Sequence, residues 1–510
     1  MNKIKERIKD LGLYNVIATA FCFILTALTA PLYIEGEIVY TYMFLIGYGA
    51  VAAILAFYGE KQGANRILVI TVSLLIAIGV LCQNAIVPIN NEVRNLDQWV
   101  FKQFLIAGFA IGFIFCFMVA RHILLKNAKG NSVWFILVAA VGALLFCCVL
   151  PEVNGARNWL NIGPLSLQIT EFVKFFGIIF MGEMILSEYS DLTKFLWLTG
   201  FIGISAVLLI VRISEMGTLI VLALVYAVLI FNYLKSGAIK TVTVLGILAF
   251  VIIFACGYLS IDKVVCKWDC YNGCKVSETN ETYVVSGIEC PQCRKNGVDT
   301  RNYYKNATYR CSKCFYRKYD KTPEAYSNYK CPMCEGHIIL DSPVGYSASK
   351  LYQRFAVFLS YDKCSHESFA DQINGGLKAA KLGGWLGEGK GTYTNIINPH
   401  NDSIVVAVGN RMGMIWVLII LLCYYSLFLS VRHSRSPVKV AAILALFIQT
   451  IITYLGNYNL FALTGIGIPF ISSGGTIYAV SLAFAFVIFT RDGRYMKEKI
   501  KSIREDGTDE

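Results

Sequence analysis

The sequence predicts an all-α polytopic membrane protein with about 12 transmembrane helices and a small β insert, and three observations support this prediction. Of the 510 residues, 56% are hydrophobic and only 16% are charged, and the mean hydropathy is +0.56. Apolar runs of about 20 residues, the length that a helix needs to cross a bilayer, recur along the chain. Basic residues lie in the short segments between these runs, so the net charge of +12 indicates membrane topology and no nucleic-acid partner.

Each expected helix is an apolar run bounded by charge, proline or glycine. The first run follows a basic N-terminus like a signal peptide, but it is long for one and further spans follow at once, so we expect an uncleaved helix. The expected spans are residues 14–33, 39–58, 66–87, 102–126, 132–150, 165–187, 194–212, 217–235, 238–260, 403–431, 437–456 and 470–490.

The orientation follows from the basic residues, which accumulate in cytoplasmic loops. When these spans are threaded in order through the bilayer, every basic connecting segment falls on one side of it, together with the N-terminus and the basic tail. Both termini are therefore expected in the cytoplasm. The segments expected outside are residues 151–164, 212–217, 261–402 and 457–469.

The long outer segment contains an inserted cysteine-rich region, residues 261–345. Three C-x2-C pairs follow one another at separations of 17 and 16 residues, and two such pairs complete one tetrahedral zinc site. Zinc is favoured because adjacent cysteines chelate a metal more readily than they bridge a fold, although an external location makes disulfides the alternative. The expected zinc ligands are Cys266, Cys270, Cys274, Cys290, Cys293, Cys311, Cys314, Cys331 and Cys334.

The insert has two possible roles. Its many aromatic residues favour a surface that docks a partner, and a stiff lid that contributes only stability is the alternative.

Glu171 and Lys174 are the first group of residues that could carry chemistry. They stand three residues apart at the start of an apolar span, so one helical face carries both and they can pair. Charges at such depth normally face a bundle interior or an aqueous cavity and mark a functional path. A buried ion pair that only fixes helix packing is the equal alternative.

Asp402 forms the second constellation, directly before an apolar span and two residues after His400. A partly desolvated carboxylate there can act as a general base or bind a divalent cation. The alternative is an aspartate that caps the following helix. The glycine run at residues 383–391 allows either a close approach to a ligand or a flexible linker.

The third constellation is a segment of small residues, 464–476, that leads into the last span. Irregular backbone at membrane depth is tolerated only where it lines a cavity or is buried in protein. This segment therefore predicts a cavity wall or a helix-packing site.

In their order and topology these segments resemble the SEDS family (shape, elongation, division and sporulation), the RodA- and FtsW-type peptidoglycan polymerases. Arg157-Asn-Trp159 resembles the family's RWI element, and Gln168 to Lys174 resembles QPSExxK. His400-Asn-Asp402 resembles HTDF, and Pro469 to Gly475 resembles PFISYGG.

Four further elements are similar to family motifs. Glu215-Met-Gly-Thr218 is similar to PDLGT, Tyr352-Gln353-Arg354 to YQR, Gln372 to the glutamine of GYQ, and residues 383–391 to GGLFGKGLG. The chain departs from the family at residues 409–413, where GNRMG replaces GEELG and removes two carboxylates. Two extra spans also precede the family's usual ten. The resemblance covers roughly residues 66–495 apart from the insert.

The resemblance implies a SEDS-type helical bundle with a defined domain organisation. The domains expected are an N-terminal pair of extra helices (1–65), the first part of the core (66–260), the cysteine-rich extracellular insert (261–345), an extracellular catalytic loop (346–402), the last three core helices (403–495) and a cytoplasmic tail (496–510).

The resemblance also implies an inverting peptidoglycan glycosyltransferase that polymerises lipid II on the outer face of a bacterial cytoplasmic membrane, beside a class B penicillin-binding protein. Asp402 would then take the proton of the acceptor sugar hydroxyl, with a divalent cation as an option, and Arg157, Lys174 and Arg354 would hold the diphosphate. A lipid II flippase or scramblase and a non-catalytic scaffold are the alternatives. The remaining substrate-binding residues implied are Trp159, Glu171, Gln353, Gln372, His400, Ser472 and Ser473.

Overall fold

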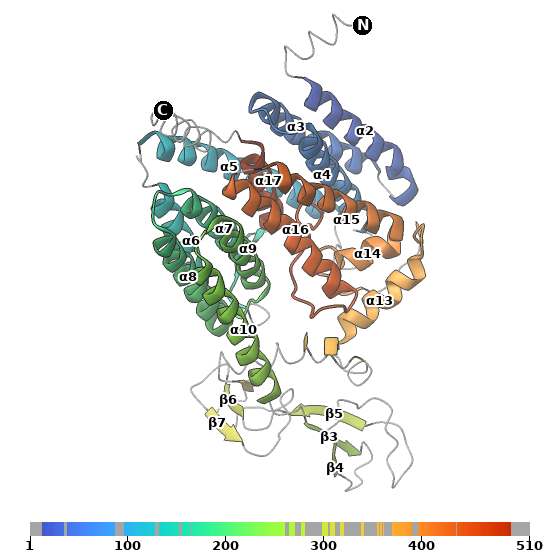
Figure 1. Ribbon diagram of the computed structural model, residues 1–510. Helices are drawn as coiled ribbons and strands as arrows, with labels where there is room; N and C mark the ends of the chain where they lie inside the picture. Colours follow the sequence, from blue (N-terminus) through green and yellow to red (C-terminus); the bar gives the residue numbers. More distant parts are fainter. Residues whose placement is uncertain are drawn as a thin grey trace, which may run out of the picture.

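The computed structural model is mainly a bundle of long helices (Figure 1). The residues that it describes are 13–34, 38–86, 96–127, 132–151, 156–163, 165–260, 265–270, 277–280, 298–303, 307–311, 317–320, 338–340, 354–355, 357–359, 361, 370–389, 396–434 and 436–490.

Within the described residues, seven helices are long and apolar enough to cross a membrane, and four more are apolar but shorter. Another helix, α7 (Ile169–Leu186), is of similar length and carries Glu171, Lys174 and Glu183. Every expected span therefore contains a helix, although the span expected at 165–187 opens with a strand instead. That strand, β2 (Leu165–Gln168), pairs antiparallel with β1 (Trp159–Ile162).

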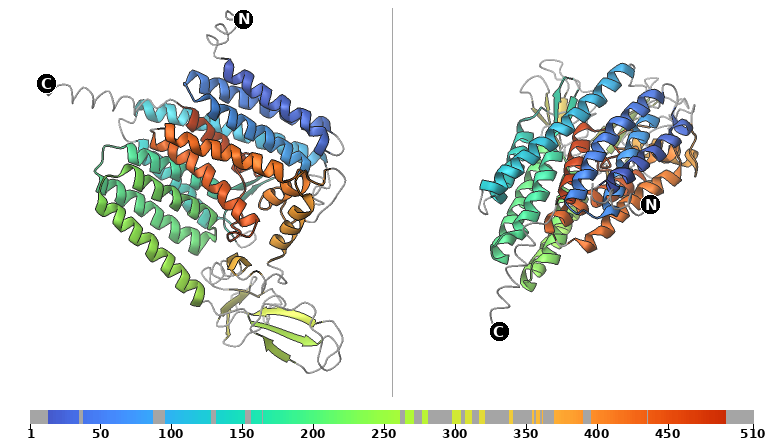
Figure 2. Two further views of the ribbon diagram at one scale, coloured as in Figure 1. Left: turned by 45° about the vertical axis from the view of Figure 1, so that its right-hand side comes forward. Right: turned by 90° about the horizontal axis from the view of Figure 1, so that it is seen from above.

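Three N-terminal helices, α2 (Tyr14–Tyr33), α3 (Ile38–Lys61) and α4 (Arg66–Ile86), lie side by side in both Figure 1 and Figure 2. Polar contacts add to their apolar packing, because a buried hydroxyl needs a partner away from water. The Thr19 and Ser73 hydroxyls lie 2.8 Å apart, and Trp416 Nε1 donates to the Tyr33 hydroxyl at 3.0 Å. The α2–α3 hairpin is thereby fastened to the rest of the bundle.

A second group of helices forms the other side of the bundle (Figure 1). Helix α8 begins at Asp191 because the Ser190 side chain accepts the Thr193 N–H and caps it. The group consists of α6 (Ser132–Val149), α7, α8 (Asp191–Val207) with its π-helical continuation (Leu208–Ile213), α9 (Gly217–Tyr233) and α10 (Gly237–Ser260).

The core lies around α17 (Gly475–Phe489), in which all 15 residues are buried. A helix that is apolar on every side is stable only when other helices surround it. Helix α17 packs against α5 (Leu96–Asn127), α16 (Pro437–Asn457), α7 and α3, and so joins the two sides of the bundle (Figure 2).

The span expected at residues 403–431 is divided in two, which corrects the sequence prediction. Helix α14 (Ile404–Arg411) ends before Gly413, and α15 (Met414–Leu429) starts after it. Gly413 has a φ of +93°, which a residue with a side chain rarely adopts, and a Cβ there would lie 2.3 Å from the Trp385 carbonyl oxygen. The close approach of the segment after α13 (Asp371–Gly383) therefore causes the break.

The insert contains two small antiparallel sheets beyond the end of α10 (Figure 1). The strands agree with the β structure expected for the insert. Six of the nine expected zinc ligands lie outside the described residues, and no side-chain position is described for Cys266, Cys270 or Cys311. The first sheet has the order β4 (Ser277–Asn280), β3 (Val265–Cys270), β5 (Val298–Tyr303), and the second β7 (Arg317–Asp320), β6 (Ala307–Cys311), β8 (Ile338–Leu340).

We predict that Gly79→Ala lowers the free energy of unfolding by about 1–3 kcal/mol, the usual cost of overpacking. A Cβ at this position of α4 would lie 2.0 Å from the backbone carbonyl oxygen of Phe470, so the helix or the segment must shift. The measurement is the thermal and denaturant stability of the purified protein in one detergent. The control is Gly47→Ala in α3, where a Cβ meets no described atom within 4 Å. Equal stability of both variants would contradict the packing described.

Candidate active site

Asp402 lies in a closed turn directly before α14. The Asn398 carbonyl accepts the N–H groups of Asn401 (3.2 Å) and Ser403 (3.1 Å), and Asn398 itself has a φ of +51°, a conformation that asparagine tolerates better than most residues. Ser403 is the N-cap residue of α14, so Asp402 lies one residue before the cap and not at it. The capping alternative for Asp402 is thus not the geometry observed.

The segment between α16 and α17 holds this turn from the other side. Ser473 donates both its N–H (3.0 Å) and its hydroxyl (3.3 Å) to the His400 carbonyl. The Ser472 hydroxyl donates to the Asn401 carbonyl at 3.3 Å and accepts the Ile468 N–H at 2.8 Å. Both serines singled out in the sequence therefore act through the backbone of the turn that carries Asp402.

Asp402 is half-buried, and the Arg354 guanidinium lies near its carboxylate. A Cβ on Gly465 would be 3.7 Å from Asp402 Oδ2 and 3.4 Å from Arg354 Nη2, and Arg354 Nη1 donates to the Thr464 carbonyl at 3.0 Å. Burial raises the pKa of Asp402 to about 6, while the Arg354 guanidinium and a hydrogen bond with Asn398 lower it. A carboxylate with such a pKa can take up a proton near neutral pH.

Gln372 also reaches this turn, because its Nε2 donates to the Ser403 hydroxyl at 3.0 Å from helix α13. The other glutamine singled out, Gln353, lies outside the described residues. The structure thus brings Arg354, Gln372, Asp402 and the two serines around one turn.

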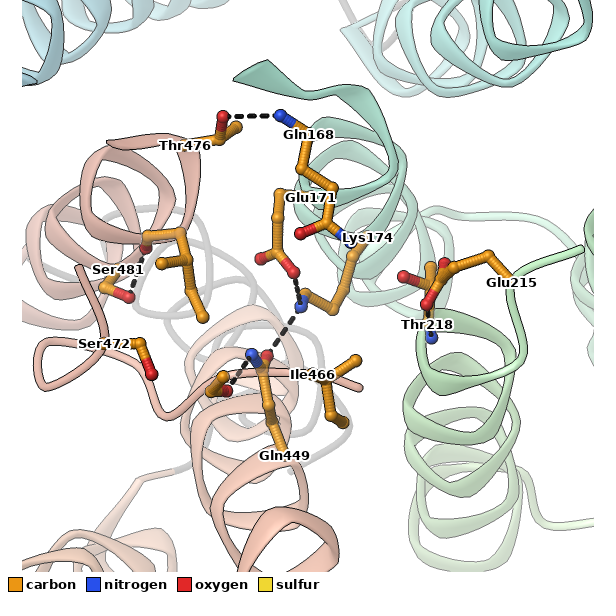
Figure 3. Close-up of polar contacts among 12 residues, drawn as sticks. Gln168, Glu171, Lys174, Glu215, Thr218, Gln449, Ile466, Ser472, Thr476 and Ser481 are labelled. Carbon is orange, nitrogen blue, oxygen red and sulfur yellow. Dashed lines mark hydrogen bonds and ion pairs between the residues drawn. The ribbon is translucent and has the colours of Figure 1, made fainter. Parts of the chain in front are cut away.

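Glu171 and Lys174 form a buried ion pair on α7, with 2.7 Å between Nζ and Oε1 (Figure 3). Lys174 Nζ also donates to Gln449 Oε1 of α16 at 2.6 Å. In this conformation the ammonium has protein partners on two sides. Its expected role in holding a diphosphate stays a prediction.

Glu215, the counterpart of the aspartate in the family turn, lies buried between the π-helical segment and α9. Its Oε1 accepts the Thr218 N–H at 3.0 Å. Burial raises the pKa of Glu215, opposed by its hydrogen bonds with Thr218 and by the positive charge of Lys174.

Trp159 begins the β1–β2 hairpin and Arg157 lies two residues before it, and backbone hydrogen bonds fix this segment. The Arg157 N–H donates to the Ile213 carbonyl at 3.0 Å, and the Ile169 N–H donates to the Asn158 carbonyl at 2.8 Å. The Gln168 N–H donates to the Thr476 hydroxyl at 2.8 Å (Figure 3). These bonds tie the hairpin to α7 and to the first turn of α17.

Two glycines of the run at the end of α13 pack against protein backbone. A Cβ on Gly383 would lie 2.1 Å from the Gly409 carbonyl oxygen, and one on Gly387 would lie 2.5 Å from that of Arg411. At Gly383 and Gly387 the close approach is therefore to the backbone of α14 and the residue that follows it, which argues against a flexible linker at these two positions. Asn410 Nδ2 fastens the same contact by donating to Glu388 Oε2 at 2.6 Å.

A pocket of mixed polar and apolar lining adjoins the two serines, on the side that faces α3, α4 and α5. Two polar atoms of its wall, Gln83 Oε1 and the Tyr478 hydroxyl, are buried without a hydrogen-bond partner. The residues that line it are Phe44, Tyr48, Gly79, Val80, Gln83, Asn84, Gln103, Ile106, Phe470, Ser472, Ser473 and Tyr478.

Two residues of α16 were missed by the sequence argument. Asn457 Nδ2 donates to the Asp402 carbonyl at 2.7 Å, and Gln449 contacts Lys174. With Thr453 they form a polar stripe at every fourth residue of an apolar helix, which places them on one face. That periodicity was the available signal.

The comparison with known families agrees with this geometry. The family of cell cycle proteins of the FtsW, RodA and SpoVE type matches residues 65–279 and 332–494. The chain belongs to this family. The matched residues contain α4, the whole described site and α17, whereas the α2–α3 hairpin precedes them and the match leaves out much of the insert.

Individual members of the FtsW/RodA/SpoVE family match shorter stretches. A probable peptidoglycan glycosyltransferase FtsW of Saccharophagus degradans is 31% identical over 165 residues, which are 30% of this chain and 40% of the relative. The stage V sporulation protein E of Bacillus subtilis is 28% identical over 184 residues, 34% of this chain and 48% of the relative. The matched part thus spans less than half the length of these relatives.

The fold is also that of a solved structure described as "Structural coordination of polymerization and crosslinking by a peptidoglycan synthase complex". The superposition covers 84% of this chain and 96% of that chain, with a TM-score of 0.50 and 14% identity. At this identity the likeness concerns the fold.

We predict that Arg354→Gln raises the pKa of Asp402 above the value of about 6, because the guanidinium lowers it. The measurement is carbodiimide labelling of Asp402, which requires the protonated carboxyl, quantified by mass spectrometry from pH 4 to pH 8. The wild-type midpoint is expected near pH 6 and the variant midpoint higher. Lys378→Gln, which removes an exposed charge on α13, is the matched control. A wild-type midpoint near the ordinary value of 3.8 would contradict the environment described.

Proposed function

We propose that this chain is an inverting glycosyltransferase that polymerises lipid II into glycan strands on the outer face of the cytoplasmic membrane. The observation that carries the proposal is Asp402, a half-buried carboxylate whose pKa is raised to about 6, held beside Arg354 within a family that includes glycosyltransferases by name. A base with a pKa near the working pH is suited to take a hydroxyl proton.

In the proposed reaction, Asp402 removes the proton of the acceptor sugar hydroxyl as the oxygen attacks the anomeric carbon of the donor. The bond from that carbon to the undecaprenyl diphosphate breaks, and the diphosphate leaves with the bonding electrons. Attack opposite to the leaving group inverts the configuration. Arg354 is positioned to stabilise the negative charge of the diphosphate, as a guanidinium forms paired hydrogen bonds with phosphate oxygens. Arg157 and Lys174 are proposed to assist it.

A divalent cation at Asp402 remains part of the proposal. Among the described residues, no group of three His, Cys, Asp or Glu side chains is placed to hold a metal ion. A magnesium ion needs only one or two protein carboxylates when substrate phosphates and waters complete its shell, so Asp402 and the donor diphosphate fit this pattern. Such an ion would supply additional positive charge for the leaving group.

We further propose that both termini lie in the cytoplasm and that the turn at residues 398–403 faces the exterior, as the basic connecting segments favour. A class B penicillin-binding protein, which would cross-link the strands, is the proposed partner.

We predict that the purified protein converts labelled lipid II into long glycan chains and that Asp402→Asn lowers the rate by at least about 100-fold, since general bases contribute roughly 10²–10⁴-fold. The products are separated by gel electrophoresis, and binding of lipid II is measured separately and should persist. Asp371→Asn, an exposed carboxylate on α13, is the matched control and should retain activity. An Asp402→Asn variant that polymerises would remove this residue from the mechanism. Transport of lipid II across vesicles without polymerisation would instead support a scramblase.

The insert is proposed to hold structural zinc. The ligands would come from the nine expected cysteines, most of which lie outside the described residues. We predict about one or two zinc ions per purified chain, because two C-x2-C pairs complete one site. Elemental analysis of the full-length protein, with a thiol count before and after addition of a chelator, measures this. A metal-free protein without reactive thiols in the insert would favour disulfides.

A further inference from the structure

We infer that Gln449 is a positioning residue that couples the buried Glu171–Lys174 pair to the turn that carries Asp402. The inference rests on the proposed function for its catalytic consequence. Its structural part depends only on the contacts of α7, α16 and the segment between α16 and α17.

The first half of the connection is the contact between α7 and α16. Lys174 Nζ lies 2.7 Å from Glu171 Oε1 and 2.6 Å from Gln449 Oε1 (Figure 3). All three side chains are buried. The side-chain amide oxygen of Gln449, Oε1, therefore accepts a charge-assisted hydrogen bond from Lys174. Such bonds are stronger than those between neutral groups, above all in an interior without water. This bond fixes which way the amide is turned.

The second half runs from the same amide to the irregular segment. With its oxygen facing Lys174, Gln449 directs Nε2 to the carbonyl oxygen of Gly467 at 2.8 Å. One turn along α16, the Thr453 hydroxyl lies 3.0 Å from the Ile466 carbonyl. Two successive carbonyls are thus held by one face of the helix.

Gly467 lies close to the turn that carries Asp402. A Cβ at Gly467 would lie 2.5 Å from the Ser472 hydroxyl and 2.9 Å from Asn401 Oδ1. Asn401 precedes Asp402, and the Ser472 hydroxyl donates to the Asn401 carbonyl. The peptide group that joins Gly467 to Ile468 donates its N–H to the Ser472 hydroxyl, which in turn donates to the Asn401 carbonyl, so a movement of this peptide is passed on to the turn. The ion pair, the amide and the turn form one continuous set of contacts.

Only an amide can make this connection in full. It accepts from the ammonium with one end and donates to the carbonyl with the other. A carboxylate accepts at both ends and would face the Gly467 oxygen unfavourably, while an apolar side chain leaves Lys174 and the carbonyl with one partner fewer. The ion pair then has a role besides packing, since it orients Gln449.

The experiment compares Gln449→Met, Gln449→Glu and the wild type. Methionine keeps the volume and removes both bonds, whereas glutamate retains the acceptor for Lys174 and loses the donor to Gly467. Both variants are expected to lower kcat for lipid II polymerisation by roughly 10- to 100-fold, the range of a misplaced reacting group, with KM unchanged within about twofold. Thr243→Val is the matched control, because its buried hydroxyl donates to the Ile239 carbonyl within α10 and the change should leave kcat unaltered.

Hydrogen–deuterium exchange of residues 464–474 supplies a measurement that does not require activity. Both variants are expected to exchange faster than the wild type at Ile468, Ser472 and Ser473, whose N–H groups are bonded within the segment or to His400. Unchanged exchange in a folded variant overturns the inference, and so does faster exchange with an unchanged kcat. A wild type that makes no glycan refutes the proposed function, and exchange alone then decides the structural coupling. If one variant fails to fold, the other supplies the same comparison.

Discussion

The site depends on one constraint: the irregular backbone between α16 and α17 must satisfy its carbonyls at a depth where water is scarce. Side chains from three helices provide the partners. Thr453 and Gln449 of α16 donate to the carbonyls of Ile466 and Gly467, Tyr424 of α15 donates to that of Pro469, and Gln83 of α4 donates to that of Ile471. Each loss would leave a buried carbonyl unpaired, at a cost of about 1–3 kcal/mol. Ser472 and Ser473 of this segment donate to the backbone of the turn at residues 398–403, so the same bonds keep Asp402 in place.

Hydropathy predicted the helices well because an apolar run of sufficient length has few alternatives in a membrane. It missed the break at Gly413, although Asn410 and Arg411 interrupt the apolar sequence there, because the long apolar runs on either side read as one span and the close contact is with the distant Trp385 carbonyl. Asp402 could be singled out by its charge beside a span. Its partner Asn457 and the bridging Gln449 could not be assigned from the sequence, because a polar residue in a helix does not reveal which carbonyl it faces.

The replacement of the family's two acidic residues by Asn410 and Arg411 has a local explanation in the packing of α14. Both side chains are buried, and Asn410 donates to Glu388 and to the Ala379 carbonyl. Arg411 Nε donates to the Ala85 carbonyl at the end of α4 at 3.2 Å. Glu388, the partner of Asn410, stands where the resembling glycine-rich element has a lysine, so the carboxylate of this chain lies on the glycine-rich side of the contact. The changes at Glu388, Asn410 and Arg411 therefore belong to the packing of α14, and none of them is next to Asp402 in the sequence.

The α2–α3 hairpin, which precedes the family match, limits how a lipid could approach α17 from the bilayer. Tyr48 of α3 packs against Tyr478 with 4.9 Å between ring centroids, and Tyr58 stacks on Phe486 at 4.6 Å. Near the cytoplasmic-facing end expected for α17, Gly59 rests on Phe489. Helix α3 thus covers one flank of α17 with aromatic contacts at Tyr478 and Phe486. If the chain takes the lipid-linked donor proposed above, entry of its isoprenoid tail between α3 and α17 would require these rings to separate, so entry on another flank of the bundle is favoured.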